Sequence, residues 1–161
     1  MIYANREQDD YQGEGWNIRT ALKQLYHYGV CLNKDFPYPE SYKSERKKFL
    51  KDKDRLLELA SPHKISAYFR CNNDDEIKRC IMQKGCVITS SSVTQKFFLS
   101  GDITNETISN SKNGGHAYII IGWTKDNKWI IQDSYSYLRP YFGRPTIAHD
   151  FRFREYWGIV L

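Results

Sequence analysis

Apolar positions in the first third of the chain follow a helical spacing. Between Gly15 and Gly29 they recur at i, i+3, i+4 and i+7, at Ile18, Ala21, Leu22 and Leu25. This spacing predicts an amphipathic helix with Gly29 as its C-terminal stop. Residues 44–60 are rich in strong helix formers and carry few apolar side chains. They predict one continuous, solvated surface helix.

Further along the chain, short β-prone runs alternate with one more helical segment. Residues 64–69 predict a strand, and a helix is expected to begin at Asn72 and Asn73, which are good caps, before three acidic residues. Gly85 should end that helix. The apolar and partly β-branched run 86–89 then predicts a short buried strand.

The strongest β pattern lies in two runs, residues 116–124 and 128–133, joined by a short polar turn at 125–127. Together they predict a β-hairpin. His116 and Asp133 stand at the outer ends of the two strands. Folding the hairpin should therefore bring the two side chains close together, so that the carboxylate can accept the ring N–H and fix the orientation of the imidazole.

The rest of the chain predicts one domain over residues 1–161. Residues 100–115 are dominated by Gly, Asn, Ser, Thr and Asp, which predicts a long surface loop, and residues 156–161 predict a closing strand. No internal repeat or low-complexity tract interrupts the pattern. We expect residues 1–60 to be mostly helical and residues 61–161 to be mostly β.

Composition narrows the class of protein. With 161 residues, 40% of them hydrophobic and 15% aromatic, the chain is too apolar to be disordered. Its formal charge of +5 permits an acidic partner without establishing one. The four cysteines show neither a CxxC pair nor an accompanying histidine cluster, so neither a metal nor a cofactor is implied. The absence of a signal peptide or membrane-spanning run leads us to expect a cytoplasmic protein.

Three segments resemble papain-family cysteine peptidases. Residues 114–123 are similar to the block that carries the catalytic histidine at the start of a buried strand, and residues 129–135 are similar to the Asn-Ser-Trp block. Residues 15–38 resemble the helix, the Tyr-Gly-Val turn and the Phe-Pro-Tyr segment that follow the nucleophile helix. The resemblance implies a papain-like α+β fold, N-terminally truncated, with a C-terminal antiparallel sheet and a few short helices.

The resemblance also implies an active-site position. It places His116 and Asp133 in the catalytic positions, with Asp133 where the family usually has Asn. The neighbouring positions Gly114, Gly115, Ser134 and Tyr135 are candidates for binding, and Tyr135 replaces the tryptophan that shields the family's pair. The simpler interpretations are a strand-end histidine satisfied by a neighbouring backbone group and a turn-forming or capping aspartate.

The nucleophile of that family has no counterpart here. Its cysteine lies about 130 to 150 residues before the histidine, which would be upstream of Met1. None of the four cysteines stands at a helix N-terminus in the family's sequence context, where a thiolate would be stabilised. The glutamine that helps form the family's oxyanion hole is missing too. Cys31 and Cys80 are interpreted as small core residues.

Two basic segments suggest different partners. Residues 43–55 mix lysine and arginine with acidic residues, which favours a solvated helix over a nucleic-acid surface. Near the C-terminus, Arg152 and Arg154 belong to a set of four arginines interleaved with aromatic residues. Such a set can bind an anionic or protein partner, although a tail packed against the body explains the aromatic residues equally well.

Three functional hypotheses follow. We favour a non-catalytic papain-like pseudoenzyme that binds a protein or peptide in the groove where the family's peptidases hold their substrate. The reason is that the family's reaction needs a cysteine thiolate, and no cysteine stands in the nucleophile position. The second is an active cysteine peptidase whose cysteine segment is missing from this chain or supplied by another. The third is a binding protein whose Arg152 and Arg154 engage an acidic partner. A truncated start also predicts a homodimer, or a partner chain that completes the fold.

Overall fold

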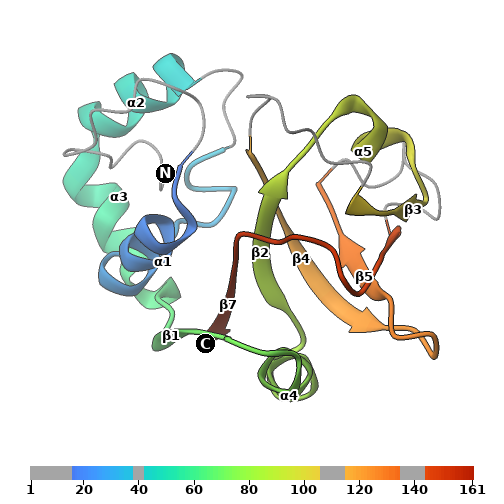
Figure 1. The fold of residues 1–161 in the computed structure, drawn as a ribbon. Helices are drawn as coiled ribbons and strands as arrows, with labels where there is room; N and C mark the ends of the chain where they lie inside the picture. The colour runs from blue at the N-terminus through green and yellow to red at the C-terminus, as the bar shows by residue number, and fades with distance from the viewer. Residues whose placement is uncertain (1–15, 38–41, 106–114, 135–143) are drawn as a thin grey trace. The chain divides into compact units, whose positions relative to one another are not determined.

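A computed structural model describes residues 16–37, 42–105, 115–134 and 144–161 (Figure 1). They form two compact units. The first contains the chain up to Tyr68 together with Val160 and Leu161, and the second runs from Phe69 to Ile159. The prediction of a single domain stays a prediction.

The first unit begins with helix α1, Ile18–His27. The side chain of Asn17 caps it by accepting a hydrogen bond from the backbone N–H of Thr20 at 3.2 Å. Gly29 follows with a φ of +78°, and a Cβ there would collide with the backbone carbonyl of Ala60. Only glycine satisfies both conditions. The predicted helix and its stop at Gly29 are confirmed.

The prediction of one continuous helix over residues 44–60 is wrong. The segment forms two helices, α2 over Tyr42–Lys51 and α3 over Lys53–Ala60, followed by the 3-10 turn η1 over Ser61–His63. Asp52 separates the helices with φ −135° and ψ 34°. The break lets each helix bury an apolar residue in the same small cluster, Phe49 from α2 and Leu56 from α3. The segment is therefore not simply solvated.

Seven strands form one sheet in the order β1, β7, β2, β4, β5, β6, β3. Their bounds are β1 Ala67–Arg70, β2 Val87–Ser92, β3 Asp102–Ile103, β4 Gly115–Trp123, β5 Trp129–Gln132, β6 Thr146–Ile147 and β7 Glu155–Val160. The pairings of β2 with β4 and β7, of β4 with β5, and of β5 with β6 are antiparallel, whereas β3 pairs with β6 in parallel. The fold is α+β.

Two helices accompany the sheet in the second unit. Helix α4, Asp74–Lys84, is capped by the side chain of Asn73, which accepts from the backbone N–H of Glu76 at 2.9 Å, and it ends at Gly85 with φ +87°. These features confirm the predicted helix. Helix α5, Gln95–Leu99, was not predicted, and Figure 1 shows it at the opposite end of the sheet from α4.

The hairpin prediction is confirmed. Strands β4 and β5 pair around a tight turn in which Asn127 adopts a φ of +60°, and Thr124 and Lys128 are joined by a backbone hydrogen bond of 2.8 Å. The predicted loop 100–115 contains the short strand β3, and residues 106–114 lie outside the described residues. The closing strand is also confirmed, as β7.

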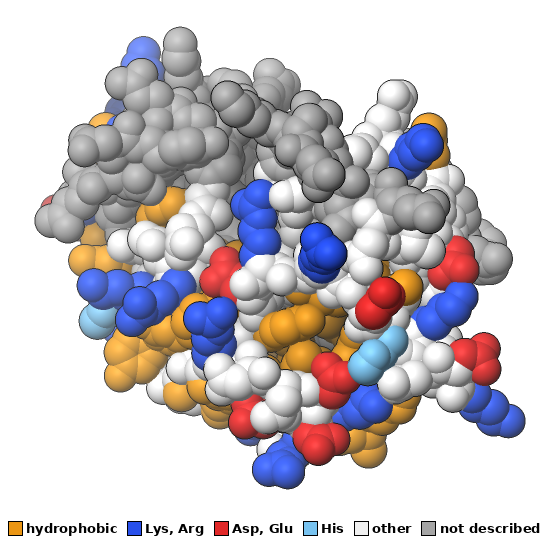
Figure 2. Space-filling view, in the orientation of Figure 1, with side chains coloured by type: hydrophobic (Ala, Val, Ile, Leu, Met, Phe, Trp, Pro, Cys, Tyr) orange, Lys and Arg blue, Asp and Glu red, His pale blue; other side chains and the backbone are white. Residues whose placement is uncertain are grey.

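The core of the second unit lies along β2, β4 and β5. Its members include Val87, Phe97, Ile120, Trp129, Ile131 and Ile147, each at most 1% exposed. No helix in the described ranges is long and apolar enough to cross a membrane. On the face shown in Figure 2, Lys and Arg side chains are interspersed with Asp and Glu rather than gathered in one patch.

Candidate active site

The hairpin brings His116 and Asp133 together. His116 is the second residue of β4, and Asp133 directly follows β5. The register of the pair, with Ile119 opposite Gln132, puts both side chains at the same end of the hairpin. The imidazole Nε2 lies 3.2 Å from the Asp133 Oδ2. The predicted proximity of the two side chains is confirmed, whereas their catalytic roles remain a proposal.

The side chains that form this contact are largely shielded from solvent. The side chain of Asp133 is 0% exposed and that of His116 is 17% exposed. A buried carboxylate is costly unless hydrogen bonds compensate for its lost hydration. Because a carboxylate only accepts, the contact favours the ring tautomer that carries its hydrogen on Nε2, and Nδ1 is then the basic nitrogen. A histidine held in this way is oriented as a general base.

Aromatic rings from α5 and β4 surround the imidazole. Phe98 meets His116 edge-on with ring centroids 5.3 Å apart, and Phe97 does so at 6.2 Å. Tyr118, two residues along β4, lies at 5.8 Å. These rings limit the positions open to the imidazole. Sequence reasoning missed Phe97 and Phe98 because the five-residue α5 is too short to show a helical period.

Two serines of β2 also belong to this end of the sheet. Ser91 lies opposite His116 and Ser92 lies opposite Gly115. Ser91 is buried, and its Oγ accepts a 2.8 Å hydrogen bond from the Tyr118 hydroxyl. In the sequence, these serines are visible only as a run at the end of a β-prone segment. Their position opposite His116 and Gly115 follows only from the pairing of β2 with β4.

The three cysteines of the second unit lie at the other end of the sheet. Cys86 directly precedes β2. It lies five positions before Ser91, the β2 residue opposite His116. At about 3.3 Å per residue, Cys86 is about 16 Å from the His116 end. The Cys80 thiol contacts the Cys86 carbonyl at 3.6 Å, and Cys71 is hydrogen-bonded to Cys80. All three thiols are therefore remote from the imidazole.

None of the four thiols is activated. Burial raises the pKa of the Cys71 thiol to about 11, with a contribution from nearby Cys80. It also raises the pKa values of Cys80 and Cys86. In the first unit, burial raises the pKa of Cys31, whose Sγ donates to the Leu56 carbonyl at 3.0 Å. A raised pKa suppresses the nucleophilic thiolate.

The remaining predicted residues have different outcomes. Gly115 opens β4, and Ser134 follows Asp133 at an exposed turn. Arg152 and Arg154 are both exposed on the segment before β7. Gly114 and Tyr135 lie outside the described residues. Across the described ranges, no three His, Cys, Asp or Glu side chains are arranged to hold a metal ion.

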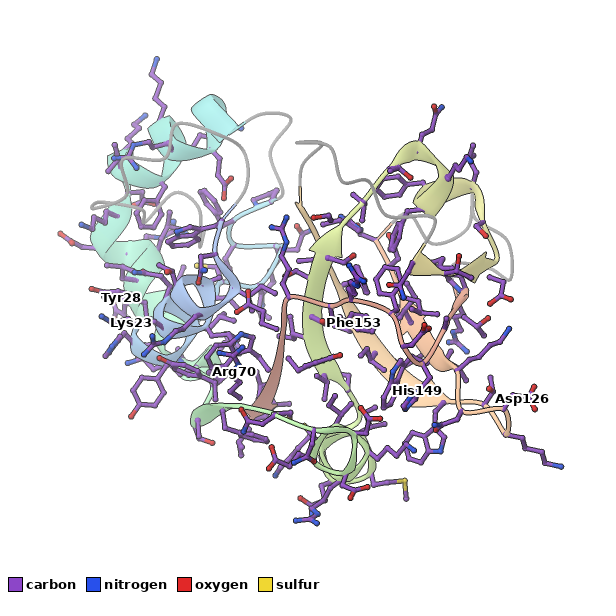
Figure 3. All side chains as sticks on the ribbon, viewed as in Figure 1. Lys23, Tyr28, Arg70, Asp126, His149 and Phe153 are labelled. Carbon is purple, nitrogen blue, oxygen red and sulfur yellow. The ribbon has the colours of Figure 1, made fainter. Side chains whose placement is uncertain are left out.

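The C-terminal aromatics pack against the sheet. Phe151 is 4% exposed, and its ring lies 5.0 Å from that of Phe153. Phe153 in turn contacts Tyr118 of β4 at 6.3 Å and Tyr156 of β7 at 5.3 Å, and Figure 3 shows it beside β2. Packing thus accounts for these two aromatics, while Arg152 and Arg154, which alternate with them, face solvent.

The sheet with its flanking helices defines a protein of the papain-like class. Residues 5–139 match the family model of papain family cysteine proteases. The chain belongs to the papain family. No curated protein matches it in sequence.

Solved structures agree on the fold. Xylellain, a cysteine protease from Xylella fastidiosa, is similar with a TM-score of 0.75 at 21% identity, covering 99% of this chain and 68% of that one. The Carica candamarcensis cysteine protease CMS1MS2 in complex with E-64 has a TM-score of 0.69 at 14% identity, covering 99% and 75%. For the cysteine protease and lectin-like domains of Cwp84 from Clostridium difficile, the values are 0.62 and 19%, covering 87% and 35%. This chain thus spans only part of each.

Proposed function

We propose that this chain binds a peptide or protein segment at the His116 end of the sheet without cleaving it, as a non-catalytic papain-like protein. The observation that carries the proposal is the separation of base and thiols. The second unit holds an oriented imidazole at one end and three thiols with raised pKa values at the other. Peptide cleavage by this family's chemistry needs a thiolate beside the histidine.

The binding part of the proposal rests on what remains at the His116 end. This end combines a partly exposed imidazole and aromatic rings on one face of the sheet with the strand-end residues Ser92 and Gly115, whose side-chain positions lie on the other face. Apolar surface beside a few polar groups is typical of ligand sites.

The His116 and Asp133 pair supports a second candidate, a cysteine peptidase in which another segment or another chain supplies the thiolate. A fully buried carboxylate that contacts an imidazole at 3.2 Å is the arrangement a general base needs. In that case the same base would serve a nucleophile from outside this sequence.

A peptidyl epoxide tests the non-catalytic proposal directly. The chain and its His116→Ala variant would be incubated with the epoxide, and adducts would be located by peptide mass spectrometry. We expect no adduct that depends on His116. Stoichiometric labelling of one native cysteine, lost in His116→Ala, would overturn the proposal.

Binding is measured separately, by NMR titration with a library of short blocked peptides while mass spectrometry monitors cleavage. We expect shifts of the His116 ring and Ser92 amide signals, and intact peptides. If no peptide perturbs these signals, the binding proposal fails. Cleavage that appears only when a second, cysteine-bearing segment is added would favour the peptidase candidate.

A further inference from the structure

Arg154 is anchored at the end of the interior strand β2, at the strand ends that also carry His116. Its backbone N–H donates to the Ser90 carbonyl at 2.8 Å, and its guanidinium Nη2 donates to the Ser92 hydroxyl at 2.7 Å. Ser92 is paired with Gly115, the residue directly before His116. The register therefore places the guanidinium at the same strand ends as the imidazole. Because successive side chains of a strand point to opposite faces, the guanidinium beside Ser92 and Gly115 lies on the other face of the sheet from the His116 ring.

Gly115 provides the space that the guanidinium occupies. A Cβ at this position would lie 3.1 Å from Nη1 of Arg154, which is closer than side chains ordinarily approach. The missing side chain lets the arginine lie against the start of β4. An alanine at this position would displace the guanidinium by a few tenths of an ångström, so Gly115 gives Arg154 slightly more room at the start of β4.

The charge of Arg154 is not neutralised by its described neighbours. No ion pair among the residues that the structure describes involves Arg154, and its polar side-chain partner there is the neutral hydroxyl of Ser92. A guanidinium has five N–H donors in a planar fork that matches a carboxylate. With Nη2 bonded to Ser92, further donors remain for a ligand at this exposed position.

Arg152 provides a contrast on the same segment. It is also exposed, but its backbone N–H bonds to the Asn105 side chain at 3.0 Å, and no polar contact ties its guanidinium to the described part of β2 or β4. Between the two arginines, Phe153 packs among the aromatic rings and fixes the local backbone. Only Arg154 is therefore both held by a strand of the sheet and located at the strand ends that carry His116, on the opposite face of the sheet from the imidazole.

We propose that Arg154 is a specificity-determining residue that recognises an acidic side chain of a peptide that binds at the His116 end and crosses the ends of β2 and β4 from the His116 face to the Arg154 face. This inference rests on the proposed function, because it requires a peptide at that site. It assigns the recognition to Arg154 and excludes Arg152, although both were candidates from the sequence.

The test uses alanine tetrapeptides, blocked at both ends, that carry one Glu at each of the four positions, with a matching set that carries Gln. Dissociation constants would be measured by NMR for the unmodified chain, Arg154→Gln and Arg152→Gln. For one position of the acidic residue we expect about fivefold tighter binding of Glu than of Gln, the upper range for an exposed charge pair. Arg154→Gln should abolish this preference and Arg152→Gln should retain it.

Two additions complete the design. Arg154→Lys keeps the charge and should retain part of the preference, so a folding defect in Arg154→Gln cannot imitate the result. Raising the salt concentration should shrink the preference in the unmodified chain. Equal binding of Glu and Gln peptides, or loss of the preference in Arg152→Gln, would overturn the role of Arg154 alone. Failure of every peptide to bind would overturn the proposed function as well.

Discussion

The two ends of strand β2 differ in what they hold. At one end, Ser91 and Ser92 face the start of β4, where His116 contacts Asp133 and Arg154 reaches Ser92. At the other end, the thiols of Cys71, of Cys80 in α4 and of Cys86 just after α4 are buried or half-buried. Side-chain hydrogen bonds and aromatic packing together organise the first end, whereas thiols with raised pKa values occupy the second. The difference explains why none of these three thiols lies beside the imidazole.

The largest expected effect is at the His116 end, at Phe97 of α5. Its ring is 0% exposed and contacts both His116 and Tyr118. Phe97→Ala should lower the free energy of unfolding by about 3 to 5 kcal/mol, because it leaves a cavity beneath the imidazole. Urea denaturation measures this loss.

Leu99→Ala is the matched control on the same helix. Leu99 is 70% exposed, so its truncation should change the free energy of unfolding by less than about 0.5 kcal/mol. A loss below about 1 kcal/mol for Phe97→Ala would mean that α5 does not support the His116 end as described.

Local sequence patterns predicted those elements whose signals are contained within them. Helix α4 is specified by Asn73 and Gly85 at its ends, and the hairpin by its turn and β-prone strands. The break at Asp52 was missed because strong helix formers continue on both sides of it. The break is favoured by tertiary packing, which buries Phe49 and Leu56 together, and packing of this kind overrides local propensity.

In the candidate site, too, the contact between residues close in sequence could be predicted and the contact between distant residues could not. The proximity of His116 and Asp133 could be predicted because they are only 17 positions apart in the sequence, at the outer ends of the two strands of one hairpin. The contact of Arg154 with Ser92 spans 62 residues and depends on where β7 joins β2. Nothing in the local pattern of either residue specifies that pairing, so the arginine could be predicted only as one of a basic set.

The end of the sheet that holds Cys71, Cys80 and Cys86, called the thiol end below, should react slowly with alkylating reagents. With the pKa of Cys71 raised from 9.0 to about 11, its thiolate fraction at pH 8 should be on the order of a hundredfold lower than that of an unperturbed thiol. Alkylation of Cys71 by iodoacetamide should be slower by at least this factor in the folded protein, and should accelerate about tenfold per pH unit below pH 10, because the thiolate is the reacting form.

The control for this measurement is the same protein unfolded in guanidinium chloride, where Cys71 should react at the rate of a free thiol. Peptide mass spectrometry reports each cysteine separately. Rapid alkylation of Cys71 in the folded protein at pH 7 would show that this end of the sheet holds a reactive thiol, contrary to the contrast drawn between the two ends of β2.

The smallest expected effect concerns the packing of the thiol end at Gly158 of β7. A Cβ there would lie 2.7 Å from the Cys80 Sγ and would collide with the Phe69 ring. Gly158→Ala should therefore lower the free energy of unfolding by about 1 to 3 kcal/mol, the usual cost of overpacking. Gly122→Ala in β4 is the control, since its Cβ would meet only Ile130 Cδ1, at an ordinary 3.8 Å.

A double-mutant cycle assigns the cost of Gly158→Ala to its neighbours. If the Phe69 ring causes most of the collision, the cost should fall in a Phe69→Ala background, and the difference is the coupling energy between the two positions. If the cost stays unchanged there, the buried Cys80 thiol is the obstacle. A cost no greater than that of Gly122→Ala would show that the thiol end is loosely packed, and the contrast between the two ends of β2 would then rest on the His116 end alone.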